Sequence, residues 1–154
     1  MPNPLDAPDA VAAAAEPLEE LLDSVIFVSS LELFSVVPVA GVAPGPDRLA
    51  NLAQAVYDAG PTGHRVGWPV RPFEPRRTWR EILHRQVTAR LTEPDQVRLA
   101  GELTEGIADL IEAHLGPVRS FCDVSDPRSG YIWWRNLLLV TDDWATILHF
   151  GVCD

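Results

Sequence analysis

Lysine is absent from this chain of 154 residues, so all twelve basic residues are arginines, against 22 aspartates and glutamates. The formal net charge is -10, which excludes broad nucleic-acid binding because an acidic surface repels a polyanion. The charge is compatible with solubility, with a basic protein partner, or with a small-molecule site. The missing lysine, with the high Ala, Pro and Leu content, is typical of a GC-rich bacterial genome.

Cysteine is scarce, and Cys122 and Cys153 are too few for a disulfide framework and lack zinc-binding spacing. No HxxxH pair occurs, because the histidines are far apart in sequence: His64, His84, His114 and His149. GxGxxG, GKS and GKT motifs are also missing. We therefore predict no metal site and no cofactor.

A long uninterrupted apolar run is missing too. The most apolar stretch, residues 24–42, contains Glu32, Pro38 and four serines, so it predicts strands and not a membrane span. The amino terminus lacks a basic region and contains several acids, which does not fit a secretory signal. We expect a cytoplasmic protein with no membrane partner.

The composition, 47% hydrophobic and 22% charged, predicts one globular domain over residues 1–154. Residues 1–8 are rich in proline and predicted to be loose. Helical sequence follows over residues 10–24, where Pro17 is expected to break or restart the helix because it lacks an N–H.

Three further helices are predicted from their ends. Asp47 is a candidate N-cap for a helix that stops at Gly60. Capping boxes, T-W-R-E at residues 78–81 and T-E-P-D at residues 92–95, predict two helices with almost no linker. These two should therefore pack as antiparallel or sharply angled neighbours.

Residues 60–77 contain four prolines and three glycines in 18 residues, which predicts a long irregular loop. Strands are expected within residues 24–42 and 118–124, and two more within residues 130–154. Runs of strands and runs of helices favour an α+β fold with a mainly antiparallel sheet. Its C-terminal β-hairpin would pack against about four helices.

A two-residue turn at Asp142-Asp143 would pair Asn136 with His149 in that hairpin. A longer turn would shift this register. Both faces are apolar, so each must be covered by helices, by the Pro-rich loop or by another molecule. The alternatives are a buried central hairpin and a docking face for a protein or a second copy, through Trp133, Trp144, Asp142 and Asp143.

His149, Asn136 and Cys153 have the composition of a Cys-His-Asn catalytic site. However, Cys153 is the penultimate residue, where chain ends fray, and nothing Gly-rich precedes it. We therefore interpret His149 as a hydrogen-bonded core residue and assign no catalytic residue.

Charge is segregated along the chain. Residues 1–47 hold eight acids and no base, residues 65–90 hold seven arginines against two glutamates, and residues 91–115 hold six acids and one arginine. The arginines either neutralise the acidic segments or bind a phosphate or carboxylate at the helix N-terminus near residue 78. The candidate anion ligands are His64, Trp68, Arg71, Arg76, Arg77 and Arg80.

Two function hypotheses follow. The first is a non-enzymatic intracellular protein-binding module that masks a partner through its acidic helices or Trp-rich hairpin. Immunity and antitoxin proteins have this size and charge, which is an association only. The second is a small enzyme or ligand-binding domain for an anionic small molecule. Self-association through the hairpin is a third option.

Overall fold

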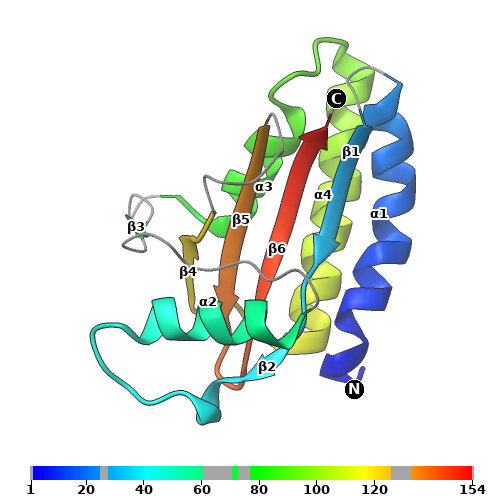
Figure 1. Ribbon diagram of the computed structural model, residues 1–154. Helices are drawn as coiled ribbons and strands as arrows, with labels where there is room; N and C mark the ends of the chain where they lie inside the picture. Colours follow the sequence, from blue (N-terminus) through cyan, green and yellow to red (C-terminus); the bar gives the residue numbers. More distant parts are fainter. Residues whose placement is uncertain (1, 25–27, 61–70, 73–76, 126–132, 154) are drawn as a thin grey trace.

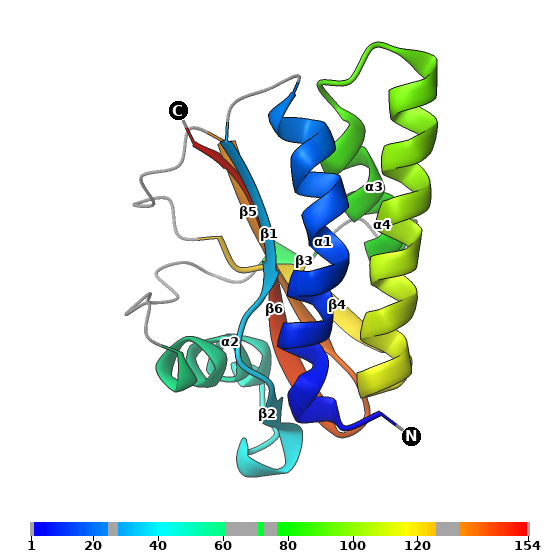
Figure 2. The ribbon, with the colours of Figure 1, turned by 90° about the vertical axis from the view of Figure 1, so that its right-hand side faces the viewer.

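The computed structural model describes residues 2–24, 28–60, 71–72, 77–125 and 133–153 (Figure 1). These residues form an α+β fold in which an antiparallel sheet packs against helices on both faces (Figures 1 and 2). The predicted fold class is confirmed. The elements in chain order are η1 (Pro4–Asp6), α1 (Ala7–Asp23), β1 (Val28–Leu33), β2 (Val37–Pro38), η2 (Val39–Gly41), α2 (Arg48–Ala59), β3 (Arg71–Pro72), α3 (Trp79–Thr88), α4 (Pro94–Leu115), β4 (Ser120–Asp123), β5 (Trp133–Val140) and β6 (Trp144–Cys153).

The sheet has the strand order β1-β6-β5-β4-β3, and β2 also pairs with β6. The C-terminal hairpin β5–β6 is therefore its centre. Thr141 and Trp144 flank the two-residue turn, and the Thr141 backbone N–H donates to the Trp144 carbonyl over 2.8 Å. Asn136 lies opposite His149. The register predicted for a two-residue turn is confirmed.

Both faces of the hairpin are covered by helices of this chain. On one face α1, α3 and α4 enclose a core that includes Leu137, Leu139, Leu148 and Phe150. On the other face α2 packs over a core that includes Leu138, Val140, Ala145 and Ile147. The alternation of these side chains accounts for the two-sided apolar pattern, and confirms the interpretation of a buried central hairpin.

The prediction that Pro17 breaks or restarts the first helix is wrong, because α1 runs from Ala7 to Asp23 with Pro17 inside it. An interior proline costs about 3 kcal/mol. Pro17 lies on the exposed side of α1. Burial of Val11, Leu18 and Leu22, each 0% exposed, contributes about 1.5–3 kcal/mol per side chain, which outweighs that cost.

One predicted capping box is confirmed and the other is wrong. Thr78 caps α3, and its side chain and that of Glu81 bond reciprocally to the backbone. At α4 the N-cap is Glu93, without a side-chain cap bond, and Thr92 lies outside the helix. Pro94 explains the shift, because its fixed φ suits the first helical position and holds the preceding residue extended.

Two segments are more regular than predicted. Within residues 1–8, which we expected to be loose, η1 leads directly into α1, and Ala7 is 0% exposed. Apolar burial at Ala7 anchors this end of the chain. Within the loop 60–77, the short strand β3 pairs with β4, although prolines are dense there. A proline is tolerated in β3 because it forms the edge of the described sheet.

Candidate functional site

The Trp-rich hairpin offers little free surface where the structure describes it. Trp144 is half-buried and packs against the core under α1, α3 and α4. Asp142 and Asp143 are exposed at the turn, and a carboxylate oxygen of Asp142 lies 3.4 Å from Nε of Arg119. The side chain of Trp133 lies outside the described residues. These four residues stay a prediction as a partner site.

Four of the six candidate anion ligands lie outside the described residues: His64, Trp68, Arg76 and the side chain of Arg71. The other two are described, and they differ. Arg77 is exposed, whereas Arg80 is half-buried against α4.

Arg80 joins α3 to the acidic face of α4. Its guanidinium donates to Asp109 over 2.7 Å and to Glu112 over 2.6 Å, and it also bonds to Glu105. Burial acts to lower the pKa of Arg80, but these three carboxylates raise it above its usual range. Arg80 therefore neutralises carboxylates of its own chain, as the first interpretation of the charge segregation predicts.

The N-terminus of α3 is also capped by hydrogen bonds within this chain. The Thr78 N–H donates to the Glu81 carboxylate over 3.3 Å, and the Glu81 N–H donates to the Thr78 hydroxyl over 3.1 Å. A hollow of about 360 Å³ lies beside it. Its lining residues mix bases and acids: Arg77, Arg80, Glu81, His84, Arg85 and Glu105.

A chain of buried hydrogen bonds links the hairpin to α2. The Tyr57 hydroxyl donates to the Val124 carbonyl over 2.9 Å, and it accepts from the side-chain amide of Asn136 over 2.9 Å. Oδ1 of Asn136 lies 2.6 Å from Nδ1 of His149. His149 is 3% exposed. We call this chain the buried relay, and it confirms the interpretation of His149 as a hydrogen-bonded core residue.

Strand β1 forms the opposite edge of the described sheet from β3. Glu32 on β1 and three acidic residues of α1 lie close enough there to interact electrostatically. We call Glu16, Glu19, Asp23 and Glu32 the acidic edge. Partial burial raises the pKa of Glu19, and the charges of Asp23, Glu32 and Glu16 raise it further. A hydrogen bond with the Leu31 backbone partly offsets these effects. Asp23, Glu32 and Glu16 therefore each repel the charge on Glu19.

The acidic edge differs from α4 in how its charge is balanced. Within the part of the chain that the structure describes, Glu16, Glu19 and Glu32 form no ion pair, whereas Glu105, Asp109 and Glu112 share Arg80. No basic residue precedes Arg48 in the sequence. Glu16, Glu19 and Glu32 thus give the acidic edge a negative potential that they do not share with an arginine of the described residues.

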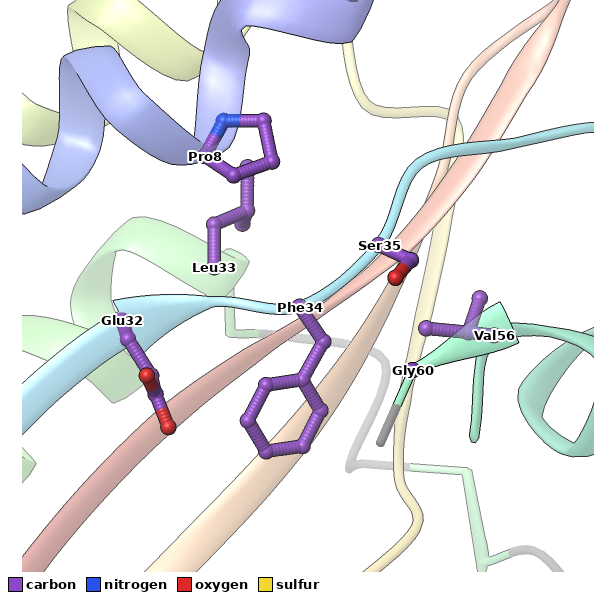
Figure 3. Close-up of a pocket in the computed structure, with 7 residues that line it drawn as sticks. All are labelled: Pro8, Glu32, Leu33, Phe34, Ser35, Val56 and Gly60. Atoms are coloured by element: carbon purple, nitrogen blue, oxygen red, sulfur yellow. The ribbon is translucent and has the colours of Figure 1, made fainter. Parts of the chain in front are cut away.

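A cavity of about 250 Å³ opens where β1 ends (Figure 3). We call it the edge pocket. Its walls come from the start of α1, the end of β1 with the residues after it, and the end of α2. They are Pro8, Glu32, Leu33, Phe34, Ser35, Val56 and Gly60. The lining is mostly apolar, and Glu32 is its acidic residue.

The aromatic wall of the edge pocket rests on the buried relay. The Phe34 ring stacks on the His149 imidazole, with centroids 5.6 Å apart and planes inclined by 14°. The Tyr57 ring also lies beside the Phe34 ring, with their centroids 6.1 Å apart. The relay therefore fixes a wall of the pocket. Sequence reasoning missed this site, although Glu32, the one charge inside an apolar strand, was a signal for it.

Other chemistry finds little support among the described residues. Burial, with a smaller contribution from Asp123, raises the pKa of the Cys122 thiol to about 12, so this cysteine is a poor nucleophile. No cluster of His, Cys, Asp and Glu suited to a metal ion occurs in the described part of the chain. None of the described helices combines the length and apolar character needed to cross a bilayer.

Comparisons with known protein families, with curated proteins and with solved structures find no match for this chain.

Proposed function

We propose that this protein is a non-enzymatic binding module that masks a basic segment of a partner protein through its acidic edge. The observation on which this rests is that Glu16, Glu19 and Glu32 form no ion pair among the described residues, whereas the carboxylates of α4 share Arg80. Asp23, Glu32 and Glu16 also repel the charge on Glu19. A cationic partner relieves this repulsion, and its attraction speeds association.

The contrast between the two acidic surfaces supports this choice. On α4 the intramolecular Arg80 already neutralises three carboxylates. Glu16, Glu19 and Glu32 form no ion pair among the described residues, so their charge remains available to another molecule. Self-association at this edge is opposed, because two acidic edges repel each other.

The proposal is tested by panning a library of random peptides against the wild-type protein at low salt. Enriched peptides should carry net positive charge. Their affinity should fall as salt screens the interaction, over a Debye length of about 10 Å at 0.1 M. The double variant Glu16→Gln, Glu19→Gln should bind them more weakly. Asp95→Asn combined with Glu102→Gln is the matched control, because both residues lie on α4 and pair with Arg98.

Enrichment of neutral or acidic peptides would contradict the proposal. So would equal affinity of the wild type and the double variant.

A second candidate is a site for an anionic small molecule at the hollow beside α3. Its support is the convergence of Arg77, His84 and Arg85 on one concave surface of about 360 Å³. Thermal denaturation with added phosphate, nucleotides and carboxylates tests it. The candidate is supported if a ligand stabilises the wild type but not the Arg77→Ala, Arg85→Ala variant. It is rejected if no ligand stabilises the wild type.

A further inference from the structure

The outward side of β1 presents backbone groups as well as carboxylates. The Phe34 N–H donates to the Ile147 carbonyl over 2.8 Å, so these two residues form a hydrogen-bonded pair at the end of the β1–β6 ladder. Antiparallel pairs alternate between hydrogen-bonded and non-hydrogen-bonded. The neighbouring pair, Leu33 with Leu148, is therefore non-hydrogen-bonded, and the Leu33 N–H and C=O point away from β6.

The same alternation places the Leu31 backbone on the outward side. The Leu31 backbone acts to lower the pKa of Glu19, which agrees with this direction. Glu19 therefore lies beside one outward position of the edge, whereas the next one, at Leu33, opens at the edge pocket. In Figure 2 the β1 edge of the sheet faces the viewer, between α1 and α2.

An open sheet edge can accept one more strand. A strand added here would form backbone hydrogen bonds at Leu33, and alternate side chains would point toward the two faces of the sheet. The side chain that enters the edge pocket meets the Phe34 ring, the apolar Val56 and the Glu32 carboxylate. Arginine and lysine match this mixture, because each combines an apolar stem with a cationic end.

We propose that the partner binds as an extended basic segment that adds to β1 as a further strand, with one arginine or lysine side chain in the edge pocket. This inference rests on the proposed function and specifies how it operates. Charge complementarity selects the occupant, since Glu32 lies in the pocket and Glu19 lies beside the same strand. A second copy of this chain is disfavoured by the same carboxylates.

The test uses the peptide VRVRVRV, a copy of it methylated on every backbone nitrogen, and the acidic peptide VEVEVEV. Dissociation constants are measured by fluorescence anisotropy at low salt. The unmodified basic peptide should bind. The methylated copy keeps the charge but lacks backbone donors, so it should bind at least about tenfold more weakly, while the acidic peptide should not bind.

Two variants locate the contact. Glu32→Gln removes the charge of the edge pocket, and Glu20→Gln is its control with the same change of net charge on the exposed side of α1. Gly60→Ala narrows the pocket without strain, since an added Cβ would lie 3.6 Å from the Ser35 hydroxyl. Glu32→Gln and Gly60→Ala should weaken VRVRVRV binding several-fold, and Glu20→Gln should leave it unchanged.

The outcomes separate the two proposals. Strand addition is overturned if the methylated and unmodified peptides bind equally well, or if neither pocket variant weakens binding. Either outcome leaves the role of the acidic edge in place. Failure of both basic peptides to bind overturns strand addition and the proposed function together.

Discussion

Nδ1 of His149 and Oδ1 of Asn136 lie 2.6 Å apart across the central hairpin. The donor and acceptor in this pair follow from the other end of the buried relay, at the Val124 carbonyl. The Val124 carbonyl can only accept, so the Tyr57 hydroxyl donates to it and accepts from the Asn136 amide. Oδ1 of Asn136 must then accept from Nδ1–H of His149, which determines the tautomer.

Removing the hydroxyl of Tyr57 tests the energetic role of the buried relay. Tyr57→Phe leaves the Asn136 amide and the Val124 carbonyl without this partner in the core, so we expect a loss of about 1–3 kcal/mol in the free energy of unfolding. Urea denaturation measures it. Thr104→Val is the control, because the Thr104 hydroxyl bonds to Ala100 in its own helix. An equal loss in both variants would argue against a special role for the relay.

Arg80→Ala should destabilise the protein by about 1–2 kcal/mol. Charge-assisted hydrogen bonds are worth about 1.5–3 kcal/mol, and the value is discounted because Glu105 and Asp109 are more than half exposed. Added salt should recover part of the loss by screening the remaining carboxylates. Arg98→Ala, which breaks only exposed pairs, should cost less than about 0.5 kcal/mol. Equal losses would show that the Arg80 pairs contribute little.

Pro17→Ala should stabilise the protein by about 1–3 kcal/mol, since alanine restores the missing N–H and removes the ring from the middle of α1. Thermal or urea denaturation provides the measurement. Pro94→Ala serves as the control, because Pro94 occupies the first position of α4, where proline is favoured. No gain from Pro17→Ala would mean that the helix has adapted to its proline without cost.

Glu19→Gln should stabilise the protein at neutral pH by a few tenths of a kcal/mol, the size of like-charge repulsion on a helix. The sign follows from linkage: the folded-state pKa of Glu19 is raised above the usual value, so its charged form destabilises the fold above that pKa. The gain should shrink as pH falls through the raised pKa, and vanish below about 4.5, where the carboxyl is protonated in both states. Urea denaturation across this range measures it, and a gain that grows toward low pH would reverse the account.

The hairpin could be predicted because its determinants are local. Two-residue alternation and the Asp142-Asp143 turn define the register, and the apolar character of both faces requires two layers of cover. Pro17 shows where local rules fail. The cost of proline in a helix is a local property, but the burial of Leu18 and Leu22 that outweighs it depends on tertiary packing.

Glu32 was a signal for the edge pocket, but the walls of the pocket could not be predicted, because three distant segments form them. Pro8, Phe34 and Val56 meet only after α1 and α2 have packed on opposite sides of the sheet. Charge segregation indicated in general terms that the arginines meet acidic helices. It could not indicate that Arg80 in particular meets α4, since that depends on how the two helices pack.

Amide hydrogen exchange at β1 tests the central claim most directly. In the free protein the Phe34 amide, which donates to Ile147, should exchange more slowly than the Leu33 amide, which points away from β6. Saturation with VRVRVRV should slow exchange at Leu33 markedly and leave Phe34 little changed. Unchanged exchange at Leu33 with the peptide bound would contradict strand addition at the acidic edge.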